Sequence, residues 1–487
     1  MTSWFAGLFY ASGLFALAYY LIVNGTYLIV HVAALFHLKD DLREHSAEAM
    51  ETQFDSAFLP DVAVLVPAYN EAPVITDTVE SLLTVNYPDT EIVVINDGST
   101  DDTLARLESA FDLVEVDADL PLEIPAESIR AVYRTAAFDE LLVIDKENGG
   151  KSDALNAGLW LTEQTYFCTI DADSILDQEG LRQVLRPFRE HSDKTIACGG
   201  TVRIANGCTL TGGRITAVDL PSSWLAEIQA MEYLRAFYSG RLGLDKLKSL
   251  VLISGTFSVF KTDVVREIGG YATDSITEDF ELIVRLHKHA IDGDEDYRIE
   301  FVPDPVVWTE VPESLGVLSK QRRRWYRGLI DTLINHRSMI ANPRYGPVGL
   351  FGLPFMLFTE ALGRLIEGLG YIILPVGYFL GFLDPAFLAL YFVLTIWFGV
   401  FLSWFGIFSE VWSFRRYDDP RQILRLMGDA VLENVGFRQW KTYIAWRGLI
   451  EYLLNIDYWG EMRRGGFNTA RRQTEQLGSM AASDDHR

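Results

Sequence analysis

The first 38 residues of the chain lack Asp, Glu, Lys and Arg altogether. This stretch is longer than the roughly 20 apolar residues that a helix needs to cross a bilayer. It also lacks the basic start and short apolar core of a cleavable signal peptide. We therefore predict a retained transmembrane anchor, with a linker, over residues 1–51.

Charge is also missing from residues 385–409, inside a second apolar block that runs from about 349 to 412. The block predicts two further spans, at about 365–383 and 386–411. The preceding stretch, 348–358, is predicted to be an interfacial helix, because proline fits poorly inside a straight bilayer helix. Segment 423–454 carries too many charges for an isolated span and is expected to lie along the membrane surface. Together these helices form a predicted membrane unit over 346–460.

Basic residues follow the spans, in "SFRRYDDPRQ" and in "EMRRGGFNTARR" of the polar tail 461–487. The positive-inside rule places both in the cytoplasm. We therefore predict a multi-pass protein of the cell membrane, in contact with lipids, whose polar region 52–345 is a cytoplasmic domain. The formal net charge of -25 argues against nucleic acid as a partner, because most of this surface would repel phosphates.

Cysteine is scarce as well. The three residues, Cys168, Cys198 and Cys208, do not have the spacing of metal ligands. Buried, reduced thiols are the expected state, and no redox role is predicted.

Within the polar region, apolar runs alternate with helical patterns. The runs at 62–68 and 91–97 have the composition of buried strands, and each precedes a segment with helical periodicity. The same alternation resumes at about 140, after a less regular stretch at 112–140 that is expected to be a loop or small insertion. A βαβα order of this kind predicts a parallel sheet with helices as crossovers.

Polar clusters stand where the predicted strands end, which is where open α/β sheets bind ligands. Asp171 and Asp173 follow one such strand, and residues two apart in an extended chain point to the same side. The two carboxylates are therefore able to converge on one Mg²⁺ or Mn²⁺, with substrate phosphates completing its shell. The alternative is that Asp173, Ser174 or Asp177 caps the helix that follows.

Seven motifs then occur in a fixed order: "VPAYNE", "VINDGSTDDT", "ENGGKSDALNAGL", "TIDADS", "ISGTFSVFK", "TEDFELIVRL" and "QRRRW". Over about 62–330 the chain resembles family 2 glycosyltransferases of the membrane-embedded polysaccharide-synthase type, which make cellulose, chitin, hyaluronan and poly-N-acetylglucosamine. The resemblance implies an α/β GT-A fold, Rossmann-like with a mostly parallel sheet, flanked by transmembrane and interfacial helices. It also implies metal-dependent, inverting transfer from a UDP-sugar to a β-linked polysaccharide.

The resemblance assigns a set of residues to the donor: Tyr69, Asn70, Glu71, Asp97, Lys151, Asp153, Asp171 and Arg324. Asp97 is expected to hydrogen-bond the uracil or ribose, and Arg324 to meet the diphosphate as a bidentate cation. Lys151 lies close to the start of a predicted helix, a place suited to an anion. The alternatives are a half-buried loop aromatic for Tyr69, a turn residue for Asp97 and a solvent-facing side chain for Lys151.

For the chemistry, the resemblance implies that Asp173 holds the cation and that Asp279 of "TED" (Thr277, Glu278, Asp279) is the general base. The alternative for this triplet is a helix cap. For the acceptor, the implied residues are Gln321, Trp325, Ser254, Gly255 and Thr256, with the Trp ring packing under the terminal sugar. Arg322 and Arg323 are interpreted as a solvated or membrane-facing helix face.

Two other functions stay open at this point. One is transfer of a single sugar to a lipid-linked or glycan acceptor, since three spans are few for a channel unless the chain forms a homo-oligomer or has a small membrane subunit. The other is a membrane scaffold that keeps the fold without catalysis. The presence of Asp173, Asp279, Gln321, Arg324 and Trp325 together argues against the scaffold.

Overall fold

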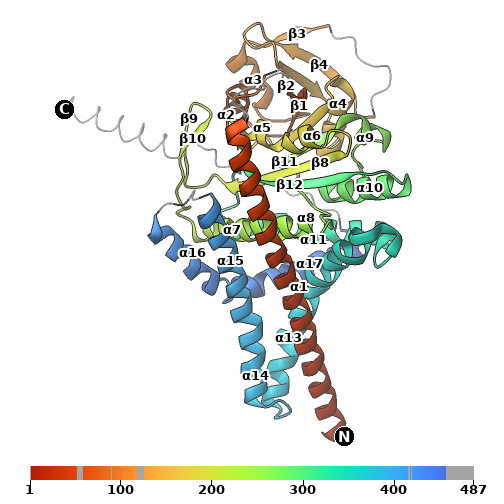
Figure 1. Ribbon diagram of the computed structural model, residues 1–487, viewed down its shortest axis with the longest axis vertical. Coiled ribbons are helices and arrows are strands. Elements are labelled where there is room, and N and C mark those ends of the chain that lie inside the picture. The colour runs from red at the N-terminus through yellow and green to blue at the C-terminus, as the bar shows by residue number, and fades with distance from the viewer. Residues whose placement is uncertain are drawn as a thin grey trace, which may run out of the picture.

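The computed structural model describes residues 2–51, 59–88, 90–117, 125–414, 417 and 419–456. The predicted tail 461–487 lies outside these residues. A domain built on a large sheet occupies one end of the molecule, and long helices extend from it to the other end, where the N-terminus lies (Figure 1). A layer of helices that includes α7, α11 and α17 lies between the two (Figure 1).

The sheet has ten strands, in the spatial order β3-β4-β5-β2-β1-β6-β11-β8-β12-β7. Their bounds are β1 Val62–Ala68, β2 Thr90–Asp97, β3 Val114–Val116, β4 Ile129–Arg134, β5 Leu141–Lys146, β6 Tyr166–Ile170, β7 Ser174–Leu176, β8 Thr195–Ile204, β11 Phe257–Lys261 and β12 Arg298–Thr309. A separate hairpin pairs β9 (Thr209–Thr211) with β10 (Arg214–Ala217).

The centre of the sheet is parallel, as the alternating pattern predicts. Strands β5, β2, β1 and β6 all run in one direction, and β1 pairs with β2 from Val62↔Thr90 to Ala68↔Asn96. The apolar run of β1 is buried on both faces, which is typical of a parallel strand covered by helices. Antiparallel pairs flank this core: β3 and β4 at one edge, β11 between β6 and β8, and β7 beside β12. The stretch 112–140, expected to be a loop or small insertion, contributes the two strands β3 and β4.

The helices of this domain are α2 Ile75–Leu83, α3 Thr103–Phe111, α4 Lys151–Leu161, α5 Gly180–Val184, α6 Arg186–Glu190, α7 Trp224–Arg235, the π-helical η1 Ala236–Arg241, α8 Leu242–Lys246, α9 Thr262–Glu267, α10 Glu278–Asp292 and α11 Leu315–Asn335. Short 3-10 turns, η2 Arg337–Met339 and η3 Pro343–Tyr345, follow α11. Helix α10 illustrates why they form: apolar residues recur along the face that packs on the sheet, and acidic residues occupy its first turn.

Three helical runs in the described residues are long and apolar enough to cross a membrane: Phe9–Asp41, Val348–Phe379 and Pro385–Ser413. The first lies within α1 (Thr2–Glu51). The second comprises η4 Val348–Gly352, α12 Leu353–Phe355, η5 Met356–Ala361 and α13 Leu362–Phe379. The third comprises α14 Pro385–Phe392, η6 Val393–Trp397 and α15 Phe398–Ser413. Helices α16 (Pro420–Leu432) and α17 (Phe437–Leu453) follow.

The stretch 348–358, which we predicted to be an interfacial helix, continues directly into α13. The two later runs are separated by a tight turn, at which Pro385 takes the first helical position and the Asp384 carboxylate accepts a hydrogen bond from the Ala386 amide at 2.7 Å. Helix α1 packs closely against the domain, because a Cβ atom at Gly243 in α8 would lie 2.0 Å from the carbonyl oxygen of Val30.

A buried ion pair joins the sheet to the third run. Arg203 of β8 pairs with Glu410 of α15, and the two side chains are 2% and 0% exposed. The rings of Tyr238, Trp308 and Tyr417 surround the guanidinium, with centroids 5.4 to 5.7 Å away.

We predict that Arg203→Met lowers the stability of the full chain by about 3–5 kcal/mol, because it removes the guanidinium that pairs with the fully buried Glu410 carboxylate. The measurement is thermal unfolding in detergent. Arg298→Met is the control, since the Arg298 and Glu300 side chains are 45% and 22% exposed. A drop in Tm no larger than that of the control would contradict the prediction.

Candidate active site

One cavity of about 630 Å³ gathers most of the predicted catalytic and acceptor residues. It lies where the domain meets the helices that extend from it. Twelve of the predicted residues line it: Lys151, Asp171, Asp173, Ser254, Gly255, Thr256, Thr277, Glu278, Asp279, Gln321, Arg324 and Trp325. They come from the end of β6, the loop before β11 and the helices α4, α10 and α11, so five separate motifs converge in space.

The acidic pair that follows β6 is held by neighbouring side chains. The Asp173 carboxylate is 3% exposed and accepts a hydrogen bond from Thr309 Oγ1 at 3.2 Å. Asp171 accepts one from Thr256 Oγ1 at 2.8 Å. Residues 174–176 form strand β7, and the next helix begins at Gly180. The alternative that Asp173, Ser174 or Asp177 caps that helix is therefore wrong.

The donor set at this position fits a divalent cation. Among the described residues, no group of three or more His, Cys, Asp or Glu side chains is arranged to hold a metal. Two cavity-lining carboxylates leave most coordination positions to other oxygen ligands, which is how Mg²⁺ is commonly held together with substrate phosphates. Asp171 and Asp173 are the residues that would supply the protein ligands.

Lys151, at the start of α4, connects two motifs. Its Nζ atom lies 2.6 Å from Asp171 Oδ1 and 3.0 Å from Glu278 Oε1, and it donates to the Gly255 carbonyl oxygen at 3.3 Å. Burial alone would lower the pKa of this amine, but Asp171 and Glu278 raise the pKa above its usual value. The alternative of a solvent-facing lysine is therefore wrong, and Lys151 is a charged link between β6 and α10.

The two adjacent carboxylates at the start of α10 differ in proton affinity. Burial and the neighbouring Glu278 raise the pKa of Asp279, while Lys151, the Phe280 amide and Arg241 oppose the rise. For Glu278, burial also favours the neutral form, but Lys151 and Arg324 outweigh it and lower the pKa. Environments that push two pKa values apart are typical of acid and base pairs in active sites.

Close packing fixes where Asp279 stands. A Cβ atom at Gly255 would lie 3.0 Å from its Oδ2 atom, so the loop before β11 passes directly against the carboxylate. Thr277 precedes the helix, as a cap would, but its side chain makes no capping hydrogen bond. Asp279 Oδ1 instead accepts from the Phe280 amide at 2.8 Å.

Several predicted residues carry polar atoms that are buried and have no hydrogen-bond partner: Gln321 Oε1, Arg324 Nε and Thr277 Oγ1. Buried polar atoms are normally paired, so these three atoms are available for hydrogen bonds to a molecule in the cavity. Arg324 in addition has no carboxylate partner among the described residues, whereas the nearby Arg322 and Arg323 pair with Glu232 and Glu451. The side chains of Arg322 and Arg323 are 19% and 13% exposed, so they do not form the solvated helix face that was one of the two interpretations.

The residues after β1 lie apart from this cavity lining. Tyr69 is 47% exposed, so its ring is accessible to a flat ligand. Asn70 adopts a left-handed conformation with φ 57°, and its Oδ1 atom accepts from the Thr100 amide at 2.7 Å. Glu71 donates its amide to Thr103 Oγ1 at 2.9 Å. Asn70 and Glu71 thus join the ends of β1 and β2, and their predicted contact with the donor stays a prediction.

Asp97 is buried and organises the turn that begins α4. Its carboxylate accepts hydrogen bonds from the amides of Gly149 and Gly150 at 3.0 and 2.8 Å, and Gly150 supplies the positive φ of 87° that the turn requires. Lys146 Nζ donates to Asp97 Oδ1 at 2.7 Å and also pairs with Asp153. A direct hydrogen bond from Asp97 to uracil or ribose stays a prediction.

The sequence analysis did not identify Lys146, whose side chain is 0% exposed between the carboxylates of Asp97 and Asp153. A lysine inside an apolar strand that precedes two glycines is the signal that could have identified it.

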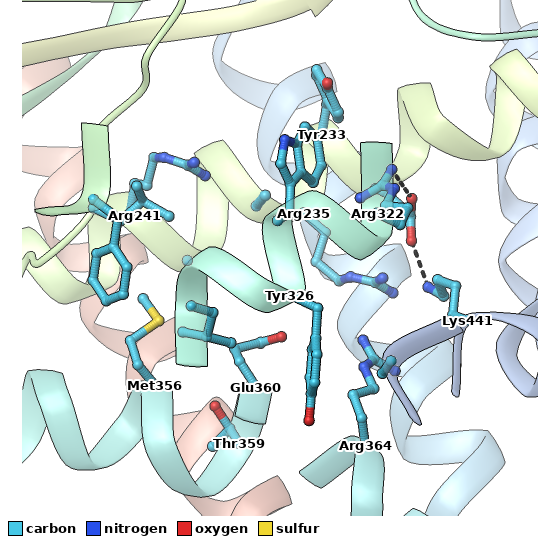
Figure 2. Close-up of a pocket in the computed structure, with 18 of the residues that line it drawn as sticks. Tyr233, Arg235, Arg241, Arg322, Tyr326, Met356, Thr359, Glu360, Arg364 and Lys441 are labelled. Carbon is cyan, nitrogen blue, oxygen red and sulfur yellow. Dashed lines mark hydrogen bonds and ion pairs between the residues drawn. The ribbon is translucent and has the colours of Figure 1, made fainter. Parts of the chain in front are cut away.

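The cavity also continues beyond Trp325 to Arg235, Arg364 and Lys441, which point into one space beside Tyr326 (Figure 2).

This deeper part of the cavity has walls from all three apolar helical runs. The wall residues include Tyr20 and Asn24 of α1, Arg364 and Glu367 of α13, Thr395 of η6 and Gly399 of α15. Glu367 pairs with both Arg364 and Arg438, so charges that face the cavity there are compensated. The wall there combines these polar and charged groups with apolar side chains such as Val23, Phe355 and Leu402.

Comparison with known proteins identifies a family. The family model described as "Glycosyltransferase like family 2" matches residues 60–328. Poly-beta-1,6-N-acetyl-D-glucosamine synthase of Staphylococcus aureus is 31% identical over 277 residues, which are 57% of this chain and 56% of that protein. The synthase of the same name from Staphylococcus epidermidis is 29% identical over 274 residues, 56% of this chain and 55% of that one. The chain thus spans about half the length of the curated relatives it matches.

Two solved structures are also similar. A mannosyltransferase of Pyrobaculum calidifontis, in complex with GDP-Man and Mn²⁺, is 16% identical with a TM-score of 0.49, over 89% of this chain and 100% of that one. Residues 1–349 of Staphylococcus aureus TarS, in complex with UDP-GlcNAc, are 15% identical with a TM-score of 0.37, over 83% and 95% of the two chains.

We predict that Lys146→Met weakens UDP binding about tenfold or more, because the loss of charged hydrogen bonds releases the turn that presents Lys151. Calorimetric titration of the full chain with UDP and Mg²⁺ measures this. Lys194→Met serves as the control, since Lys194 and its partner Asp296 are 46% and 75% exposed. Equal UDP affinity in the two variants would contradict the role given to Lys146.

Proposed function

The chain belongs to the family 2-like glycosyltransferases, and from this membership we propose that it transfers a sugar from a UDP-sugar to a growing β-linked polysaccharide at a membrane. The observation that carries the proposal is the convergence on one cavity of the carboxylate pair Asp171 and Asp173, a third carboxylate, Asp279, with raised pKa, and Arg324, which has no carboxylate partner among the described residues. A chain that only tethers a partner needs none of these groups in one place.

Asp279 and Arg324 each suit one step of the proposed transfer reaction. Asp279 takes the proton of the acceptor hydroxyl as that oxygen attacks the anomeric carbon, and the bond from this carbon to the diphosphate oxygen breaks. Attack from the face opposite the leaving group inverts the anomeric centre, so an α-linked donor gives a β-glycoside. UDP departs with the bonding electrons, and Arg324 donates hydrogen bonds to its phosphate oxygens.

Mg²⁺ or Mn²⁺, bound at Asp171 and Asp173, would offset the negative charge that develops on the departing diphosphate. Lys151 is a cation of the chain itself on the same side of the cavity. Its Nζ atom lies within 3.0 Å of Asp171, which follows β6, and of Glu278 in α10. It therefore holds the donor side of the cavity in a fixed position relative to the base before a ligand binds.

We infer that the polymer, rather than a single added sugar, is the product, because the cavity continues past Trp325 between the three apolar runs. Polar side chains of this wall, such as Asn24, Thr395 and Arg364, are able to hydrogen-bond the hydroxyl groups of a sugar chain, and the apolar ones between them suit its C–H faces. The multi-pass arrangement with a cytoplasmic domain belongs to this proposal, as does a homo-oligomer or small membrane subunit that would complete the passage. N-Acetylglucosamine is the proposed sugar, since the matched relatives carry it in their names.

The test uses membranes that contain the full chain, a panel of UDP-sugars and either Mg²⁺ or Mn²⁺, with released UDP and product length as readouts. We expect long polymer from UDP-N-acetylglucosamine and no transfer in the presence of a chelator. Addition of one residue would establish the single-transfer alternative instead. Absence of UDP release with every donor would contradict the proposed function.

Two variants assign the roles. Asp279→Asn should lower kcat about 10²–10⁴-fold, the usual contribution of a general base, while leaving UDP binding largely unchanged. Asp173→Asn should weaken the metal-dependent part of donor binding. Normal turnover in Asp279→Asn would remove its assignment as the base.

The raised pKa of Asp279 predicts how pH affects the rate. The base works when ionised, so activity falls as pH drops through the pKa of the folded protein. Glu278→Gln removes the nearest like charge, lowers the pKa of Asp279 and should move the acid limb of the kcat/KM profile to lower pH.

Glu281→Gln is the matched control, because Glu281 lies on the same helix but pairs with Arg285 at 2.8 Å. The acid limb of the kcat/KM profile of Glu281→Gln should lie at the same pH as that of the wild type. A limb that stays in place or moves to higher pH in Glu278→Gln would show that Asp279 is not the group being titrated.

A further inference from the structure

Arg322 and Trp325 stand one helical turn apart on α11 and are in direct contact. The guanidinium carbon of Arg322 lies 4.5 Å from the centroid of the Trp325 ring system. A planar guanidinium at this distance stacks on the negative face of an indole. Both side chains line the cavity, so the stack is part of its wall.

A carboxylate from another helix holds this arginine in place. Glu232 of α7 accepts from Arg322 Nη2 at 2.8 Å, and its other oxygen pairs with Lys441 of α17. Figure 2 shows the two interactions as dashed lines from Arg322 and from Lys441. The side chains of Glu232, Arg322 and Lys441 are 10%, 19% and 10% exposed, so solvent screens the network weakly.

The cations around Glu232 favour the charged form of its carboxylate. Burial alone would raise the pKa of Glu232, but Lys441, Arg322 and Arg235 together lower the pKa to about 2. The carboxylate is therefore ionised whenever the protein is folded under physiological conditions. A permanently charged anchor gives the guanidinium one orientation, and the guanidinium in turn restricts the indole that it covers.

An indole has two faces, and a cation stacked on one of them leaves only the other for a sugar. Pyranose rings pack on aromatic faces through their C–H groups, so the covered face decides on which side of Trp325 the terminal sugar lies. The uncovered face then fixes the height and tilt of that sugar relative to Asp279.

We propose that Arg322 is a positioning residue, which fixes the indole of Trp325 with one face free for the terminal acceptor sugar, and that Glu232 and Lys441 anchor it. The inference rests on the proposed function and adds to it a link from the acceptor site to α17. Through Lys441, helix α17 sets the position of the Trp325 ring on which the acceptor sugar packs.

The chain contains a matched control for this idea. Arg323, the next residue, pairs with Glu451 of α17, so it also ties α11 to α17. Among the described contacts it does not stack on Trp325. A role in helix packing alone predicts equal effects of the two arginines, whereas a role in acceptor positioning predicts an effect of Arg322 only.

The experiment measures initial rates with full-length enzyme in nanodiscs, Mg²⁺, UDP-N-acetylglucosamine and a β-1,6-linked N-acetylglucosamine oligosaccharide as primer. We expect Arg322→Met to raise the primer KM about tenfold and to shorten the product, with donor KM within about twofold of wild type. Arg322→Lys keeps the charge next to Glu232, and hence the fold, but loses the planar stack, so it should raise primer KM by a smaller factor. Lys441→Met should shift primer KM in the same direction.

Arg323→Met should leave primer KM and product length unchanged. The inference is overturned if Arg322→Met and Arg323→Met behave alike, or if Arg322→Met raises donor KM as much as primer KM; the proposed function survives both results. A wild-type enzyme that transfers no sugar from any UDP-sugar would overturn the proposed function, and the inference with it.

Discussion

Charged groups confined to one cavity have to be neutralised by one another, and this constraint governs the centre of the molecule. Asp171, Glu278 and Asp279 face this cavity, and Lys151 stands between the first two at 2.6 and 3.0 Å. Lys151, together with Arg324, lowers the pKa of Glu278. Burial and the charge of Glu278 outweigh the same lysine at Asp279 and leave its pKa raised, so the two adjacent carboxylates differ because of their distinct neighbours.

The same constraint couples the sheet domain to the helices beneath it. Arg203 and Glu410 are a buried pair that joins the sheet to α15, and Glu232 and Lys441 join α7 to α17 within the layer of helices below the sheet. Breaking one partner of such a pair is costly because the other charge stays buried. The domain and the apolar helices therefore hold one relative position, which keeps the cavity continuous from Asp279 to Arg364. Tyr69 and the donor-side turn lie outside this junction.

Local patterns predicted much of the fold and of the candidate site. Strand β1 has the predicted bounds and β2 begins one residue earlier, because buried parallel strands leave a continuous apolar run in the sequence. The antiparallel position of β11 was not predicted, since strand direction depends on distant pairing. The alternative that Asp173, Ser174 or Asp177 caps the next helix failed because β7 intervenes, and strand pairing with the distant β12 leaves no local signal. Partners such as Glu232 for Arg322 lie 90 residues away in sequence and leave no local signal.

The cavity has walls from both the first helix of the chain, α1, and the last described one, α17. During translation the carboxylates of the sheet domain exist long before Lys441 leaves the ribosome, so a partly made chain has an open, unwalled site. The lining of the cavity is therefore complete only once α17 has packed beside α11 and α13.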